Sequence, residues 1–177
     1  MGIILKQGVQ NTIITYLGIV IGFVNTIIIQ PYFLTTEEIG LTRILYSFSL
    51  LIAIFMPMGV TNMTIRYFPF FRNELNGHNG YFGFMLIFPF FGFIITSLFL
   101  FIFQDLIIAK YIKEAKLFTE FFHCIYPLSL FLCLIFILSA YCSSIFKSSV
   151  PTFLNDIFVR ILSVILFSVY FIKLIDI

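Results

Sequence analysis

Long stretches without a formal charge constrain this chain more than any other feature. Four windows of more than twenty residues lack Asp, Glu, Lys and Arg, and they cover residues 7–36, 44–65, 75–104 and 121–146. An α-helix of about 20 residues crosses a hydrocarbon core about 30 Å thick. The 177 residues are 61% apolar, with a mean hydropathy of +1.12. The sequence therefore predicts an all-α, polytopic transmembrane helix bundle.

Five membrane-spanning helices are predicted within one membrane domain that covers residues 1–177. Their ranges are about 9–30, 41–66, 81–103, 121–146 and 151–172. Three prolines are expected to end or bend these helices, because proline disfavours a continuing helix. Pro31 is expected to end the first helix, and Pro57 with Gly59 to kink the second. A bend is expected at Pro127 in the fourth helix.

Two connecting segments carry recognisable signals. Thr35 or Thr36 is a plausible N-cap for the second helix, with Glu38 favoured in the first turn. Between the third and fourth helices, residues 104–120 are amphipathic, with three lysines on one face. That pattern predicts a short helix that lies in the membrane interface.

Composition argues against several function classes. The net charge is +2 and the basic residues are dispersed, so nucleic acid is not an expected partner. Cys124, Cys133 and Cys142 are nine residues apart, so neighbours face opposite sides of a helix and cannot converge on a metal. His78 and His123 have no nearby ligand at a suitable spacing. We expect no enzymatic activity, no cofactor and no metal site.

The strongest candidates for a functional site interrupt the fifth predicted helix. Asn155, Asp156 and Arg160 are polar or charged, and the last two are four residues apart, so they can pair on one face. Each charge near mid-membrane costs about 2.5 to 3.5 kcal/mol. This face should therefore turn toward protein or water, and an intramembrane ion pair suggests a functional site. An ion pair at the end of a helix is the alternative reading.

Further candidates lie on the first two helices. Gly18 and Gly22 form a GxxxG spacing, which lets another helix approach closely. Asn25 could face a polar cavity or form a hydrogen bond to a neighbouring helix. Arg66 could form a cationic mouth for an anionic headgroup, or it could extend to the interface beside its aromatic neighbours.

Several short stretches carry a resemblance to a known family. Residues 6–8 and 11–13 read KQG and NTI, residues 31–41 read PYFLTTEEIGL, and residues 59–62 and 65–69 read GVTN and IRYFP. Over residues 6–72 the chain resembles the N-terminal part of polysaccharide flippases, within the multidrug/oligosaccharidyl-lipid/polysaccharide exporter superfamily. The resemblance implies two six-helix lobes that alternate in access around a central cavity, of which five helices are present here.

The resemblance also implies a function. Such flippases move a polyprenyl-linked oligosaccharide across the bacterial inner membrane, for surface polysaccharide or O-antigen assembly. Arg43, Arg66 and Arg160 are the positions that could meet its phosphate. Charge counting leaves the orientation open, so the cytoplasmic N-terminus is taken from the family. Expected partners are the lipid bilayer, a second lobe in the same or another chain, and glycosyltransferases or a polymerase.

Two other functions compete with a flippase. A cation-coupled multidrug antiporter of the same superfamily would favour acidic cavity residues, of which Asp156 is the deep example here. A non-transporting membrane scaffold could instead bind glycan-assembly enzymes. Alternating access needs two lobes that move relative to each other, and this chain corresponds to one lobe. We therefore do not expect the chain to transport by itself.

Overall fold

The computed structural model describes residues 2–71, 80–111 and 116–166. Helices joined by turns make up these ranges, which contain no β-strand. Five helices are long and apolar enough to cross a membrane, and they cover Leu5–Phe33, Thr36–Phe55, Tyr81–Ala109, Phe122–Ser144 and Ser149–Leu166. The chain is an all-α, multi-pass membrane protein, as the uncharged windows predicted. It divides into two compact units, residues 1–39 with 145–177 and residues 40–144.

The first unit contains two long helical rods. One is α1 (Ile3–Val24), which continues through the π-helical segment η1 (Asn25–Ile29) into α2 (Gln30–Phe33). The expected end of the helix at residue 30 was wrong by three residues. In η1 the backbone N–H of Gln30 donates to the carbonyl of Asn25, five residues back. This wider turn takes up the ring of Pro31, which would clash with a carbonyl in a regular α-helix.

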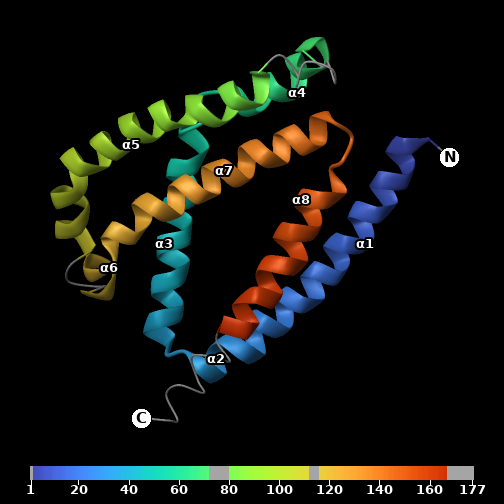
Figure 1. Cartoon of the computed structure of the whole chain (residues 1–177). Helices are drawn as coiled ribbons and strands as arrows, with labels where there is room; N and C mark the ends of the chain where they lie inside the picture. Colours follow the sequence, from blue (N-terminus) through green and yellow to red (C-terminus); the bar gives the residue numbers. More distant parts are fainter. Residues whose placement is uncertain (1, 72–79, 112–115, 167–177) are drawn as a thin grey trace. The chain divides into compact units, whose positions relative to one another are not determined.

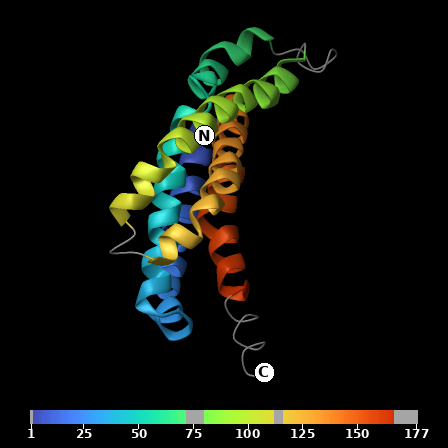
Figure 2. The same cartoon turned by 90° about the vertical axis from the view of Figure 1, so that its left-hand side faces the viewer.

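The second rod is α8 (Ser149–Phe153), which continues through the π-helical segment η4 (Leu154–Phe158) and is helical to residue 166. The last six residues of the predicted range 151–172 lie outside the described part. Figures 1 and 2 show the two rods side by side, and contacts run from α1 to both α8 and η4. The two rods run in the same direction. This is the arrangement that the first and fifth of five successive membrane crossings must have.

A capping box begins α3 (Thr36–Phe55). The backbone N–H and the hydroxyl of Thr35 donate to Glu38 Oε2 over 2.8 and 2.9 Å. The N–H of Glu38 returns a hydrogen bond of 3.4 Å to Thr35 Oγ1. These reciprocal bonds satisfy donors that a helix start leaves free. The structure thus selects Thr35 as the N-cap, one of the two predicted positions.

The second predicted helix, 41–66, is broken rather than kinked. It divides into α3 and α4 (Val60–Phe71), with a turn at residues 56–59 between them. Pro57 removes a backbone donor, and Met58 and Gly59 both have positive φ values, +46° and +87°. A helix cannot pass through such a pair of residues.

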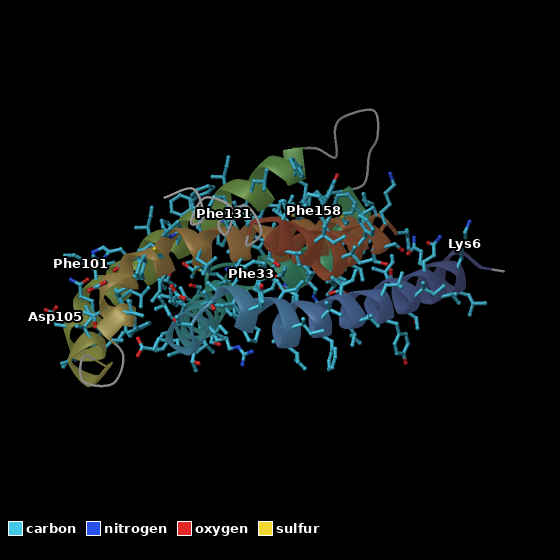
Figure 3. All side chains as sticks on the ribbon, turned by 90° about the horizontal axis from the view of Figure 1, so that it is seen from below. Lys6, Phe33, Phe101, Asp105, Phe131 and Phe158 are labelled. Atoms are coloured by element: carbon cyan, nitrogen blue, oxygen red, sulfur yellow. The ribbon has the colours of Figure 1, made fainter. Side chains whose placement is uncertain are left out.

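The rest of the second unit follows the predicted spans with changed ends. α5 (Tyr81–Tyr111) runs eight residues beyond the expected end at 103, and Figure 3 shows Phe101 and Asp105 on its last part. The first half of the segment 104–120 therefore extends a membrane-spanning helix. The expected separate interfacial helix is reduced to α6 (Lys116–Glu120). Residues 112–115 lie outside the described part.

The fourth predicted helix, 121–146, begins with the short 3₁₀ helix η3 (Phe122–Cys124) and becomes α7 (Ile125–Ser144). Pro127 lies in the first turn of α7, directly after the change from 3₁₀ to α-helix, and not in the interior of a helix. Proline is tolerated at this position because the N–H groups of a first helical turn have no intrahelical partner.

Aromatic and aliphatic side chains form the core of the second unit. One cluster consists of the buried residues Leu100, Phe118, Phe122 and Ile125, against which the partly buried apolar face of α3 packs. A second cluster centres on Phe68, whose ring lies edge-on to Tyr81 and Tyr141, with centroids 5.7 and 5.2 Å away. The first cluster joins α3, α5, α6, η3 and α7, and the second joins α4, α5 and α7.

A candidate polar site between two membrane-spanning helices

A line of polar contacts joins the two rods of the first unit, and we call it the polar seam. Its α1-side members are Gln7, Asn11, Thr15, Gly18, Gly22 and Asn25, and its partners on the other rod are Ser148, Asp156, Arg160 and Ser163. The members on α1 recur every three or four residues, which is the spacing of one helix face. Polar side chains along such a face hold membrane helices together by hydrogen bonds across the interface.

Asp156 and Arg160 both lie in the seam, but they do not bind each other. Asp156 Oδ2 accepts a hydrogen bond of 3.1 Å from the hydroxyl of Thr15. Arg160 Nη1 donates to the backbone carbonyl of Gly18. The prediction that Asp156 and Arg160 form an ion pair, made from their four-residue spacing, is therefore wrong. The other rod supplies closer partners, and the π-helical turn of η4 changes the angular relation between the two positions.

The expectation that this face turns toward protein holds. Both side chains are partly buried against α1, so the membrane does not surround either group on all sides. No carboxylate of the described residues forms a salt bridge with Arg160. A guanidinium has five N–H donors. One donor binds the Gly18 carbonyl, and the others form no hydrogen bond with the described residues.

The two glycines of the seam allow the rods to approach. A Cβ atom on Gly18 would lie 2.7 Å from Asp156 Cβ and 2.8 Å from the Asp156 carbonyl oxygen. A Cβ atom on Gly22 would meet the guanidinium of Arg160. The two glycines thus lie opposite Asp156 and Arg160, the two charged residues of the second rod within the described seam.

Asn25 occupies a buried position at the end of the seam. Its side chain is only 5% exposed, and its Nδ2 donates to Ser163 Oγ over 2.8 Å. Its Oδ1 has no hydrogen-bond partner in the described part of the chain. Asn25 opens η1, and Asn155 and Asp156 lie in η4. π-helical turns occur often at functional sites, and both of them here carry sequence-predicted candidates.

Two open grooves run along α1 beside the seam. One has a volume of about 410 Å³ and is lined by residues from Asn11 to Ile19. The other has a volume of about 450 Å³ and is lined by Ile19, Asn25 and Arg160, among others. They share Ile19, so together they follow most of the length of α1. The Arg160 guanidinium is the only charged group that lines them among the described residues.

The remaining candidates do not belong to the seam. Asn155 is exposed on η4 and makes no hydrogen bond through its side chain within the described residues. Arg43 and Arg66 are exposed on α3 and α4 of the second unit. The Arg66 guanidinium carbon lies 5.7 Å from the ring centroid of Tyr67, a cation–π contact. This contact with a neighbouring aromatic residue fits the interfacial reading of Arg66.

Several seam residues escaped the sequence analysis. Thr15 donates a hydrogen bond to Asp156, and Ser163 accepts one from Asn25. Asn11 donates to Ser148 Oγ over 3.1 Å. The signal that could have found Asn11 and Thr15 was their periodicity, since they share one face with Gly18 and Gly22. Ser163 carried no comparable signal, because a lone serine in an apolar helix is common.

The fold and the seam define a multi-pass helical membrane protein with a charged polar interface between its first and last described spans. No group of three or more potential metal ligands occurs within the described residues. Comparison of the chain with family models, with curated proteins and with solved structures finds no match.

Proposed function

We propose that this chain is the N-terminal part of a flippase for polyprenyl-linked oligosaccharide in the bacterial inner membrane. The observation that carries the proposal is Arg160, a cation in a membrane-spanning helix with no carboxylate partner among the described residues. It binds a backbone carbonyl and lines an open groove. A charge at such a depth is expensive and usually serves a substrate or ion. The resemblance over residues 6–72 supplies the substrate class.

In this proposal the groove along α1 receives the diphosphate of the lipid carrier. Guanidinium groups bind phosphate oxygens well, because their planar donors match the geometry of the anion. Asn25 and Thr26 line the same groove with uncharged polar groups. The polyprenyl tail remains in the bilayer, beside the apolar surface that η1 exposes at Ile27 and Ile28. The second lobe and the glycan-assembly partners belong to the same proposal.

The proposal is tested by comparing the binding of two lipids that differ only in the presence of the diphosphate. The chain is placed in lipid nanodiscs, and native mass spectrometry compares undecaprenyl diphosphate with uncharged undecaprenol. We expect preferential binding of the diphosphate, and a loss of roughly tenfold or more in Arg160→Gln, since a charge-assisted hydrogen bond contributes about 1.5 to 3 kcal/mol. The matched control is Lys6→Gln, which removes an exposed positive charge outside the seam. Equal binding of both lipids by the unmodified chain contradicts the proposal.

A cellular experiment separates the flippase from the two competing functions. Deletion of the gene should leave lipid-linked oligosaccharide accumulated on the cytoplasmic face of the membrane. Cation-dependent drug efflux that disappears on deletion supports the antiporter instead. Co-purification with glycosyltransferases, without any defect in translocation on deletion, supports the scaffold.

A further inference from the structure

The two rods of the first unit change register along the polar seam. Asn11 binds Ser148 near one end of the seam, and Asn25 binds Ser163 near the other end. Fourteen residues separate the two contacts along α1, whereas fifteen separate them along the second rod. Parallel α-helices that pack along one face advance by equal numbers of residues. The second rod therefore contains one residue more than the seam requires.

The extra residue is accommodated in η4. There the backbone N–H of Val159 donates to the carbonyl of Leu154, five residues back instead of four. A turn closed in this way holds one residue more than a turn of α-helix. The first of the two contacts lies before η4 and the second lies after it. The π-helical turn is thus the element that lets both contacts form at once.

A regular α-helix over residues 154–158 would bring other side chains to the seam. Each residue of an α-helix advances the rotation by about 100°. Without the extra residue in the turn, the end of the rod would rotate by about this angle relative to its start. Each seam position from Asp156 onward would then be taken by the preceding residue in the sequence. Asn155 would replace Asp156 against α1, and Val159 would replace Arg160.

The replacing side chains suit this second register. Asn155 is exposed and makes no hydrogen bond through its side chain within the described residues. Its amide oxygen can accept the Thr15 hydroxyl, which Asp156 accepts in the observed register. Val159 is uncharged, so its burial at the seam leaves no charge without a partner. The second register therefore gives Asn155 a role that the observed register does not.

The two charged residues also have a partner in the second register. Asp156 and Arg160 are four residues apart, and a regular α-helix places such residues side by side on one face. They can form there the ion pair that the observed structure lacks. The second register loses the hydrogen bond between Asn25 and Ser163, which the observed one keeps. The observed register should therefore be the more populated of the two.

We propose that η4 exchanges between its π-helical turn and a regular α-helix, and that this exchange moves Arg160 into and out of the groove along α1. In the observed register the guanidinium lines the groove. In the second register it pairs with Asp156, and Asn155 takes the contact with α1. The control of an anion site rests on the proposed function, whereas the change of register does not.

Disulfide formation in nanodiscs tests the change of register. Cys124, Cys133 and Cys142 are first replaced by Ala. Asn25→Cys is then combined with Ser163→Cys, which reports the observed register, or with Leu162→Cys, which reports the second one. Asn25→Cys removes the same hydrogen bond in both pairs, so each rate is compared between variants of the same pair.

Asn155→Leu should slow the 25–162 crosslink by roughly three- to twentyfold, the change that corresponds to one interhelical hydrogen bond in a membrane. Asn155→Ser retains a polar group and is the matched control. Neither variant should slow the 25–163 crosslink, because Asn155 is exposed in the observed register. Equal rates of 25–162 crosslinking in the two variants overturn the change of register.

Deletion of Leu154 provides a second test, since it removes the extra residue from the turn. A regular α-helix then keeps both observed contacts, so the 25–163 crosslink should persist. The 25–162 crosslink should slow by at least about tenfold. Deletion of Leu17, which increases the mismatch between the rods, is the control and should abolish the 25–163 crosslink. Loss of the 25–163 crosslink on deletion of Leu154 overturns the role of η4.

The lipid arm tests the link to Arg160. A ligand that binds one register draws the population toward it. Undecaprenyl diphosphate at about ten times its Kd should therefore slow the 25–162 crosslink by roughly tenfold, and undecaprenol should not. A diphosphate that binds without this effect overturns the link between register and groove. A diphosphate that does not bind contradicts the proposed function, while the Asn155 variants still decide the change of register.

Discussion

Gly18 and Asp156 lie at a tight contact between the two parallel rods, since a Cβ atom on Gly18 would lie 2.7 Å from Asp156 Cβ. The neighbouring atoms on this side belong to the backbone and the first side-chain carbon of Asp156. Neither can rotate away, so the rods must separate if position 18 gains a methyl group. The packing at this point therefore depends on the absence of a side chain.

Gly18→Ala should lower the free energy of unfolding by about 1 to 3 kcal/mol, the usual range for overpacking a close contact. The measurement is the thermal unfolding of the protein in nanodiscs. Gly8→Ala is the matched control, because it lies on the same helix with no atom within 4 Å of its added Cβ. A Gly18→Ala protein as stable as the Gly8→Ala protein would show that the rods do not approach in this way.

Gly22→Ala should behave differently from Gly18→Ala. Its added Cβ meets the guanidinium end of Arg160, which is flexible and can move aside. We expect a smaller loss of stability than for Gly18→Ala, together with roughly tenfold weaker binding of undecaprenyl diphosphate, because a displaced guanidinium loses a charge-assisted hydrogen bond. The two variants are compared by thermal unfolding and by native mass spectrometry. Unchanged diphosphate binding in Gly22→Ala would contradict the placement of Arg160 in the binding groove.

A double-mutant cycle tests the buried hydrogen bond between Asn25 and Ser163. The single variants Asn25→Ala and Ser163→Ala and the double variant are unfolded from the same nanodiscs. Interhelical hydrogen bonds in membranes contribute about 0.6 kcal/mol on average and up to about 1.7 kcal/mol. We expect a coupling energy within this range. Strictly additive effects would show that the two side chains do not interact.

Gly92→Ala should destabilise the second unit strongly. Its added Cβ would meet the backbone carbonyl of Met56 at the α3–α4 break, and a backbone atom cannot yield as a side chain can. A loss of about 1 to 3 kcal/mol or more is expected from the overpacking. Gly83→Ala on the same helix has no atom within 4 Å of its added Cβ and serves as the control. Equal thermal stability of the two variants would exclude the contact between α5 and the break.

Thr35→Ala should loosen the first turn of α3. The substitution removes the hydroxyl that accepts from the Glu38 N–H, and loss of such a cap costs about 0.5 to 2 kcal/mol. Hydrogen exchange of the Glu38 amide should accelerate by roughly two- to thirtyfold, which is the same free energy expressed as an opening equilibrium. Thr36→Ala is the control. Identical exchange in both variants would argue against the capping box.

The membrane-spanning architecture could be predicted because charge is so costly in hydrocarbon. Uncharged windows and their lengths are enough to predict five spans. The sequence narrowed the N-cap of the second predicted helix to Thr35 or Thr36, but the reciprocal bonds between Thr35 and Glu38 emerged only from the structure. The ends of the helices were harder to predict from the sequence. Pro31 was expected to stop a helix, but the π-helical turn before it accommodates the ring, and single-sequence patterns do not reveal such a turn.

The candidate site was predicted in part. Asp156 and Arg160 stood out because charges within a span are rare, and Gly18 and Gly22 stood out by their spacing. Which helix these residues would meet depends on tertiary packing. The spacing of Asp156 and Arg160 favoured a pair within one helix. The structure instead divides them between Thr15 and Gly18 on the other rod, where a hydroxyl and a carbonyl satisfy each group separately.

The parallel polar seam is the central claim, and disulfide formation tests it most directly. In a background with the native cysteines at 124, 133 and 142 replaced by Ala, new cysteines are placed in two pairs, at positions 11 and 148 and at positions 25 and 163. The hydrogen-bonded side-chain atoms of these pairs lie 3.1 Å apart (Asn11 Nδ2 to Ser148 Oγ) and 2.8 Å apart (Asn25 Nδ2 to Ser163 Oγ). Mild oxidation in nanodiscs should crosslink both of these pairs and neither of the exchanged pairs, 11 with 163 and 25 with 148. Crosslinking of the exchanged pairs, or failure of both matched pairs in folded protein, would contradict the seam.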